Sequence, residues 1–336
     1  MDKTIEKPRI TVLMACYNSE KYLQESMDSI LGQTYPNFEF IIIDDGSTDK
    51  SPYIIKSYAD PRIKFIKNEK NMGHTYCLNL GLSKAQGEYV ARMDSDDISL
   101  STRLEEQVKF MDSYPEIAVC GTWTKTIGQL NGHINRFFTD PEDVKANLLF
   151  YTSLAHPTVI IRKSILEKYY LRYGIDIDRD ENSEDYNLWV KLSKYEKLAN
   201  IPKVLLLYRL HETNVTSVHK QKNRESASAI RLRELTDLGL SPTREDMIIH
   251  NSTKSDLNEQ EKWLEKIIEA NKVNKIYNNK ALNKIIYHRW FEACLSHTKE
   301  GLPVYKKFTS SPLYKFKDTN KTTDNIKILI KSLLRK

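Results

Sequence analysis

Short apolar runs alternate with amphipathic segments over the N-terminal third of the chain. Four runs have the length of buried strands, and they cover residues 10–15, 39–43, 63–66 and 88–93. The first is rich in β-branched residues, which fits a buried parallel strand. Three segments between them repeat apolar residues at helical spacing; they cover residues 20–31, 50–58 and 75–85. Asn18 and Ser19 supply an N-cap for the first helix. This order predicts an α/β fold with a doubly wound, mostly parallel sheet.

The pattern loosens after a further helix at 104–111. Later strands are predicted at 117–122, 158–161 and 204–208, and a helix at 184–194. From about residue 221 the chain is polar and rich in helical periodicity, with few strand signals. We therefore predict an α/β domain over residues 1–220 and a helical C-terminal region over residues 221–336.

The composition fits an ordinary globular protein of 336 residues, with 40% hydrophobic and 29% charged residues. The four cysteines are scattered and form no CxxC pair, which argues against a zinc site or a disulfide framework and favours reduced thiols in the cytosol. The N-terminus is charged, and no apolar run approaches the roughly 20 residues that span a bilayer. We expect neither a signal peptide nor an integral membrane protein.

Charge is concentrated at the C-terminus. Residues 271–336 hold 15 Lys/Arg and 4 Asp/Glu, a net charge of +11, whereas the rest of the chain holds 36 and 41, a net charge of −5. The last twelve residues form a basic amphipathic pattern whose apolar positions are Ile326, Leu329, Ile330, Leu333 and Leu334. Such a helix either packs on the protein body or lies on an anionic membrane surface.

Three polar clusters follow predicted strands, at residues 16–18, 44–47 and 94–97. Ligands of open α/β sheets bind at the carboxyl ends of the strands. The clusters therefore predict a ligand site at one edge of the sheet.

The cluster Asp94-Ser95-Asp96-Asp97 places three carboxylates within four residues. They repel one another unless a cation neutralises them, and hard oxygen ligands suit Mg²⁺ or Mn²⁺. The alternative is a solvated acidic turn or helix N-terminus, since aspartate favours both.

In the second cluster, Asp44 and Asp45 precede Gly46-Ser47. A carboxylate at a strand end can accept hydrogen bonds from a nucleobase or a ribose. The alternative is a turn followed by a helix cap at Ser47 or Asp49. Both fit together if the cap builds the loop and leaves Asp45 free to face a ligand.

The ordered combination of these clusters resembles the family 2 glycosyltransferases with the GT-A fold, over residues 8–217. The matching pieces are Ala15-Cys16-Tyr17-Asn18, Leu31-Gly32-Gln33-Thr34-Tyr35, Asp44-Asp45-Gly46-Ser47, Asn71-Met72-Gly73, Asn79, Gly87-Glu88-Tyr89, Asp94-Ser95-Asp96-Asp97, His156-Pro157-Thr158, Glu184-Asp185 and Tyr208-Arg209-Leu210-His211.

The resemblance implies a role for several of these residues. The metal ligands are expected to be Asp94, Asp96 and His211, and Asp185, in the pair with Glu184, is the expected catalytic base. The expected donor-binding residues are Ala15, Tyr17, Asn18, Glu20, Asp44, Asp45, Asn71, Asn79, Arg92, Asp94 and Ser95. An exposed loop histidine is the alternative for His211, and a helix N-terminal turn is the alternative for the acid pair.

Other positions carry a weaker expectation. Trp123 and His156 fall where the acceptor side is expected, although a core tryptophan and a structural histidine are the alternatives. Many relatives carry an arginine where this chain has Leu78, so the diphosphate charge must be met elsewhere. Lys70, Arg92, Arg103 and the metal are the candidates.

The resemblance implies an inverting hexosyltransferase that uses Mn²⁺ or Mg²⁺. Its donor would be a nucleotide sugar, most often UDP-linked to a hexose or N-acetylhexosamine, and its acceptor a saccharide or lipid-linked saccharide of a surface glycan. It would work in the cytoplasm, with peripheral attachment to the cell membrane if the C-terminal helix binds lipid. The alternatives are a sugar-phosphate nucleotidyltransferase, for which the chain lacks a glycine-rich basic loop after the first strand, and a nucleic-acid-binding protein that uses the basic tail. The acidic body argues against nucleic acid as a partner.

Overall fold

The computed structural model describes residues 7–174, 183–212, 220–317 and 323–334. The chain divides into two compact units. The first comprises Met1–Pro141 and Thr152–Asn223, and the second comprises Glu142–Tyr151 and Arg224–Lys336. The short segment Glu142–Tyr151 thus belongs with the C-terminal helices, although it lies within the α/β part of the sequence.

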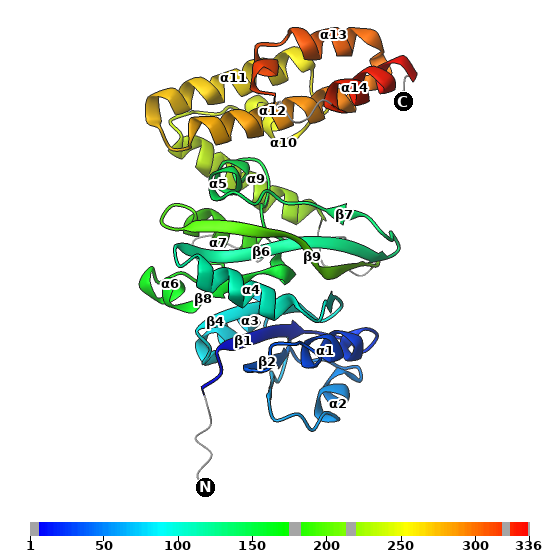
Figure 1. Ribbon diagram of the computed structural model, residues 1–336, viewed down its shortest axis with the longest axis vertical. Helices are drawn as coiled ribbons and strands as arrows, with labels where there is room; N and C mark the ends of the chain where they lie inside the picture. Colours follow the sequence, from blue (N-terminus) through cyan, green and yellow to red (C-terminus); the bar gives the residue numbers. More distant parts are fainter. Residues whose placement is uncertain (1–6, 175–182, 213–219, 318–322, 335–336) are drawn as a thin grey trace. The chain divides into compact units, whose positions relative to one another are not determined.

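The first unit is built on one mixed sheet, shown in Figure 1. Its strands are β1 (Ile10–Cys16), β2 (Phe38–Asp44), β3 (Ile63–Lys67), β4 (Tyr89–Asp94), β5 (Ile98–Ser99), β6 (Ile117–Gly128), β7 (Ile134–Asn135), β8 (Ile160–Arg162) and β9 (Lys197–Leu210). The order is β3-β2-β1-β4-β8-β6-β9-β5, with β7 paired to β6. The β1–β2, β1–β4, β2–β3 and β6–β9 pairs are parallel, which confirms the predicted mostly parallel α/β sheet.

Helices connect these strands. They are α1 (Leu23–Leu31), α2 (Ser51–Lys56), α3 (His74–Lys84), α4 (Arg103–Ser113), α6 (Lys163–Lys168), α7 (Glu184–Leu192) and the 3₁₀ turn η1 (His156–Thr158). The expected N-cap of the first helix is wrong: α1 begins at Leu23, and no side chain caps it. Asn18 and Ser19 are engaged by the neighbouring loop instead, as described below.

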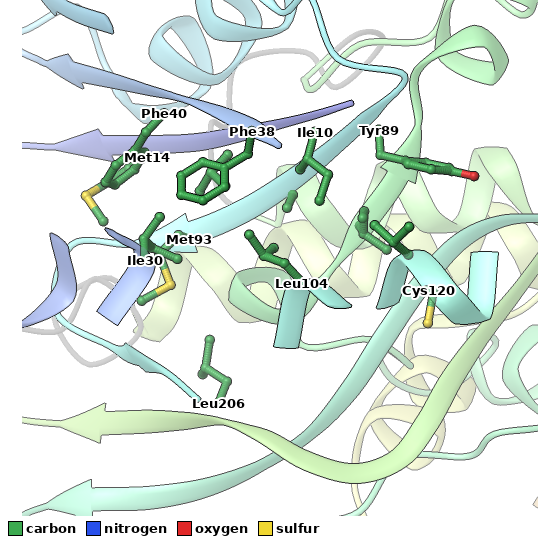
Figure 2. Packing of buried hydrophobic residues seen from close by; sticks show 14 of the residues in the cluster. Ile10, Met14, Ile30, Phe38, Phe40, Tyr89, Met93, Leu104, Cys120 and Leu206 are labelled. Atoms are coloured by element: carbon green, nitrogen blue, oxygen red, sulfur yellow. The ribbon is translucent and has the colours of Figure 1, made fainter. Parts of the chain in front are cut away.

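The core of this unit lies where α1 and α4 cover the sheet. Figure 2 shows Ile10 and Met14 of β1, Phe38 and Phe40 of β2 and Leu104 of α4 in one cluster with their neighbours. All five side chains are at most 4% exposed. Burial at roughly 25 cal/mol per Å² of apolar surface makes this cluster the main stabilising element of the sheet. The strand ends and the loops that follow them are therefore held on a rigid base.

The second unit is helical. Its elements are α5 (Pro141–Asn147), α9 (Lys220–Asp237, which crosses the boundary), α10 (Arg244–Asn251), α11 (Leu257–Asn274), α12 (Asn279–Ser296), η2 (Thr298–Glu300), α13 (Leu302–Ser310), η3 (Pro312–Phe316) and α14 (Thr323–Leu334). Trp263 of α11 and Trp290 of α12 are buried in its core. None of the helices in the described part of the chain combines the length and the apolar character that a bilayer crossing needs.

Candidate active site

The carboxyl ends of β1, β2 and β4 lie side by side at one edge of the sheet, because the three strands are adjacent and parallel. In register, Cys16 pairs with Asp44, and Ala15 pairs with Asp94. The three polar clusters of the sequence therefore meet at this edge, as predicted.

The loops after β1 and β2 hold each other through side-chain to backbone hydrogen bonds. The Asn18 N–H donates to Ser47 Oγ at 2.9 Å, and Asn18 Oδ1 accepts from the Thr48 N–H at 2.9 Å. The Lys50 N–H donates to Glu20 Oε2 at 2.9 Å. Asn18 adopts a positive φ of 48°, which asparagine tolerates better than most residues. Asn18 and Glu20 thus shape the two loops.

Two other predicted donor-binding residues of this edge lie near its surface. The Tyr17 side chain is exposed, so its ring is available to a ligand. Ser95 Oγ lies 2.8 Å from Ser19 Oγ, which links the loop after β4 to the loop after β1. Ala15 is buried and pairs with Asp94 in the β1–β4 register.

The Asp44-Asp45 pair builds a loop, which corrects the expectation that Asp45 is left free. Asp45 Oδ1 accepts from Asn68 Nδ2 at 2.7 Å and from the Met72 N–H at 2.9 Å, and its Oδ2 accepts from the Gly73 N–H at 2.9 Å. Asp44 is completely buried. Three donors saturate much of the Asp45 carboxylate, so a nucleobase would have to compete with the loop for it.

The carboxylates after β4 converge. One oxygen each from Asp94, Asp96 and Asp97 lies within 4.8 Å of the others. His211, which follows β9, places Nε2 2.8 Å from Asp96 Oδ2. Asp97 is buried, and its Oδ1 accepts from the Arg209 N–H at 2.8 Å. Asp97 is therefore held inside the protein, whereas Asp94, Asp96 and His211 are partly exposed.

These residues fit a divalent cation. Burial, together with the neighbouring carboxylates, raises the pKa of Asp96 and Asp97, because the ionised carboxylates repel one another. Two carboxylates and one imidazole suit Mn²⁺ or Mg²⁺ with positions left for phosphate oxygens. The convergent carboxylates are those of Asp94, Asp96 and Asp97, and His211 joins them through Asp96, so the ligand set of Asp94, Asp96 and His211 stays a prediction.

Arg92 brings a buried positive charge to the same strand end. Its Nη2 lies 2.5 Å from Asp94 Oδ1 and 2.9 Å from His74 Nε2. Burial opposes the charged form, but Asp94, Tyr173 and Glu184 together outweigh burial, and the pKa of Arg92 is raised. Its Nε and Nη1 have no hydrogen-bond partner among the described residues. Arg92 therefore acts first on Asp94 and orients that carboxylate.

The structure narrows the candidates that could replace the arginine missing at Leu78. Leu78 is completely buried and apolar. Arg103 is also completely buried and donates to the backbone oxygens of Arg92 at 2.8 Å and Pro157 at 2.9 Å. Arg103 joins β4 to η1 and is not available to a diphosphate. Lys70 is exposed in the loop after β3.

Glu184 and Asp185 occupy the first turn of α7, where the helix dipole stabilises negatively charged side chains. Burial, together with the charge of Asp185, raises the pKa of Glu184 to about 8. Burial also raises the pKa of Asp185, to about 6, although the Tyr186 N–H and the charge of Arg92 partly offset it. The pair holds one carboxyl group that keeps its proton near neutral pH beside one that ionises there, which suits a general base.

Two histidines surround the acid pair. Glu184 Oε1 lies 3.9 Å from His74 Nε2 and 4.0 Å from His156 Nδ1, and His156 Nε2 lies 3.1 Å from the Tyr173 hydroxyl. Burial lowers the pKa of His74 to about 4 and moves that of His156 well below its ordinary value. Both rings are therefore neutral and can donate or accept hydrogen bonds. The Arg92 guanidinium against His74 disfavours a cation between them.

Three remaining predicted residues take the following places. The Asn79 side chain donates to the Tyr173 carbonyl and accepts from the Tyr173 N–H, both at 3.0 Å, so it positions that segment. Asn71 Oδ1 accepts from the Gly73 N–H at 3.1 Å in an exposed loop. Trp123 is half-buried on β6 and donates to the Phe137 carbonyl at 3.0 Å.

Sequence reasoning missed His74, Tyr173 and Arg209 as members of this site. Arg209 donates to the Asp96 carbonyl at 2.7 Å, and its guanidinium lies 4.4 Å from the centre of the Tyr22 ring. A polar residue directly after Gly73, at a helix N-terminus beside the strand ends, was a usable signal for His74. Tyr173 carried no signal, because only the fold brings it to His156.

Comparisons with known proteins agree with this geometry. The family model described as glycosyl transferase family 2 matches residues 11–169. A glycosyltransferase of Haemophilus influenzae is 31% identical over 295 residues, which cover 84% of this chain and 86% of that protein. The Escherichia coli protein WfaP, named as a UDP-Glc:alpha-D-GlcNAc-diphosphoundecaprenol beta-1,3-glucosyltransferase, is 32% identical over 210 residues, which cover 62% of this chain and 80% of that protein.

The fold has solved counterparts. The crystal structure of Staphylococcus aureus TarS 1–349 in complex with UDP-GlcNAc aligns with a TM-score of 0.58 at 22% identity, over 85% of this chain and 88% of that chain. This likeness confirms the GT-A fold predicted from the sequence. Family model, relatives and fold agree, and the chain belongs to glycosyl transferase family 2.

Proposed function

We propose that this protein is an inverting hexosyltransferase. It transfers a hexose or N-acetylhexosamine from a nucleotide sugar, with UDP as the nucleotide, to a saccharide or lipid-linked saccharide of a surface glycan. The named activity of WfaP, a relative at 32% identity, supports a UDP-sugar donor and a lipid-linked acceptor. The free, buried cysteines favour a reducing compartment, so we place the reaction in the cytoplasm.

One observation carries the proposal: contacts through His74 and Arg92 link the half-buried acid pair to the carboxylate cluster at the sheet edge. His74 Nε2 lies 3.9 Å from Glu184 Oε1 and 2.9 Å from Arg92 Nη2, and that nitrogen lies 2.5 Å from Asp94 Oδ1. A sugar bound between them would have its leaving group towards Asp94 and an acceptor hydroxyl towards Asp185. That placement supports attack from the face opposite the leaving diphosphate.

The chain's own residues would divide the chemistry as follows. Asp185 accepts the proton of the acceptor hydroxyl while the oxygen of that hydroxyl bonds to the anomeric carbon. The bond from the anomeric carbon to the diphosphate oxygen breaks in the same step. A single displacement of this kind inverts the anomeric centre. Arg92 holds Asp94 in place by their 2.5 Å contact, and neutral His74 and His156 offer hydrogen bonds to sugar hydroxyls.

Asp94, Asp96 and His211 would hold the divalent cation. When bound there, Mn²⁺ or Mg²⁺ offsets the negative charge of the leaving diphosphate. Arg209 stabilises the loop that carries Asp96, because its backbone N–H donates to the Asp97 carboxylate and its side chain donates to the Asp96 carbonyl.

The first experiment is a hydrolysis screen of nucleotide sugars with Mn²⁺ or Mg²⁺ against an EDTA control. The second compares Asp185→Asn with wild type in transfer and in donor binding by calorimetry, with Glu167→Gln at an exposed site as the matched control. We expect Asp185→Asn to abolish transfer and keep donor affinity within about twofold, because asparagine keeps the shape but cannot take a proton. Normal turnover by Asp185→Asn would remove this residue from the mechanism.

A further inference from the structure

Helix α14 packs on the second unit through one narrow face. Ile328 and Ser332, one turn apart, are at most 2% exposed, and the helix contacts α12, α13 and η2. The sequence left two alternatives for this helix, a docked helix or a membrane-surface helix. The structure shows a docked helix, but the residues that it buries are not those of the predicted apolar face.

Most of that apolar face points outward. The relative exposures are 56% for Ile326, 48% for Ile330, 58% for Leu333 and 58% for Leu334. We call these four residues the α14 stripe. At 100° per residue, Ile326, Ile330 and Leu333 fall on one side of the helix, opposite the buried Ile328. A monomer gains nothing from four large apolar side chains left in water on one short helix.

Positive charge surrounds the stripe. Lys299 of η2, Lys306 of α13 and Lys327 of α14 are exposed on elements that touch one another, and none forms an ion pair within the described residues. Residues 299–336 carry 10 Lys/Arg and 3 Asp/Glu, a net charge of +7. The nearby acids are few: Glu300 lies 3.9 Å from His297, and Asp324 lies 3.3 Å from the Tyr287 hydroxyl.

We propose that the α14 stripe inserts into the headgroup region of an anionic membrane, with the surrounding lysines against the lipid phosphates. An apolar row beside unpaired lysines matches such a surface, where apolar burial and attraction to anionic lipid add together. A helix of 12 residues is about 18 Å long and lies flat in the interface instead of crossing the bilayer. If the acceptor is lipid-linked, which rests on the proposed function, this contact holds the enzyme where its acceptor is.

Vesicle flotation of the full chain tests the proposal without any sugar substrate, so its result does not depend on the proposed reaction. Wild type is compared on vesicles of phosphatidylcholine with and without phosphatidylglycerol. The stripe variant is Ile330→Glu with Leu333→Glu. The matched control is Ile248→Glu with Val273→Glu, which changes two residues of the same unit that are 58% and 79% exposed and lie outside the stripe.

We expect wild type and control to float with the anionic vesicles, and the stripe variant to lose at least about tenfold in binding. High salt should weaken the binding of wild type, since part of it is electrostatic. Unfolding curves of all three proteins establish that the variants fold. Two results would overturn the proposal: absent binding of wild type to anionic vesicles, or equal binding by the stripe variant. A wild-type dimer that the stripe variant converts to monomer, with vesicle binding unchanged, would assign the stripe to a second copy of the chain.

Discussion

Substitution of Arg103 tests whether buried polar contacts between α4 and the strand ends stabilise the site. It is completely buried, and its guanidinium donates to the Arg92 carbonyl at 2.8 Å and to the Pro157 carbonyl at 2.9 Å. Burial lowers the pKa of Arg103 to about 10, which keeps it charged at neutral pH. The residue thus connects β4, which carries Asp94, to η1, which carries His156. The informative change is Arg103→Met, which keeps the apolar stem and removes the donors.

The expected loss follows from the contacts. Hydrogen bonds from a charged donor contribute about 1.5–3 kcal/mol each, and methionine avoids part of the cost of burying the guanidinium. We therefore expect unfolding free energy to fall by about 2–4 kcal/mol. For a folding unit of this size, each kcal/mol of lost unfolding free energy lowers the melting temperature by about 2–4 °C. The melting temperature of the first unit should therefore fall by about 5–15 °C.

The assay is differential scanning calorimetry of Arg103→Met, Arg103→Lys and wild type, together with donor hydrolysis at a temperature where each is folded. Lysine keeps the charge but cannot reach both carbonyls, so Arg103→Lys should fall between the other two. Lys109→Met, at an exposed position of the same helix, is the control and should leave both measurements unchanged. A melting temperature for Arg103→Met within about 2 °C of wild type would refute the reasoning.

Two further predictions concern the acid pair. At saturating Mn²⁺ and low donor, kcat/KM should rise with pH through about 6, because the pKa of Asp185 is raised to about 6 and only its ionised form takes a proton; a pH-independent rate would contradict this. Glu184→Gln should gain stability over wild type as pH rises. The pKa of Glu184 is raised from 4.5 to about 8 on folding, so with rising pH this group ionises first in the unfolded chain. Glu184 therefore lowers the free energy of unfolding of wild type; this loss is absent below about pH 4.5 and complete above about pH 8. Melting curves at pH 5 and 8.5 measure this, and an equal difference at both values would count against it.

The sequence by itself determined the α/β class and the edge at which the site forms. The apolar runs and the helical segments between them predicted a mostly parallel sheet, and the polar clusters after β1, β2 and β4 were then expected at one edge of it. Asp94, Asp96 and the Glu184-Asp185 pair could be selected because they fall in the ordered motifs that resemble family 2 glycosyltransferases, since acidic residues at strand ends and helix N-termini alone also have structural uses. Their roles as metal ligands and base stay predictions until the experiments above are done.

Only the tertiary structure decided which polar side chains hold the loops and which face a ligand. Asp44, Asp45 and Asn79 looked equivalent to free ligands in the sequence, but hydrogen bonds or burial engage each of them. His74 and Tyr173 joined the site through packing against Glu184 and His156, which are too distant in the chain for a local pattern to predict. The same holds for α14: its amphipathic pattern was plain, but which face is buried depends on the helices beside it. Local periodicity predicts whether a segment forms a helix or a strand. Which elements that segment packs against depends on residues that are distant in the chain.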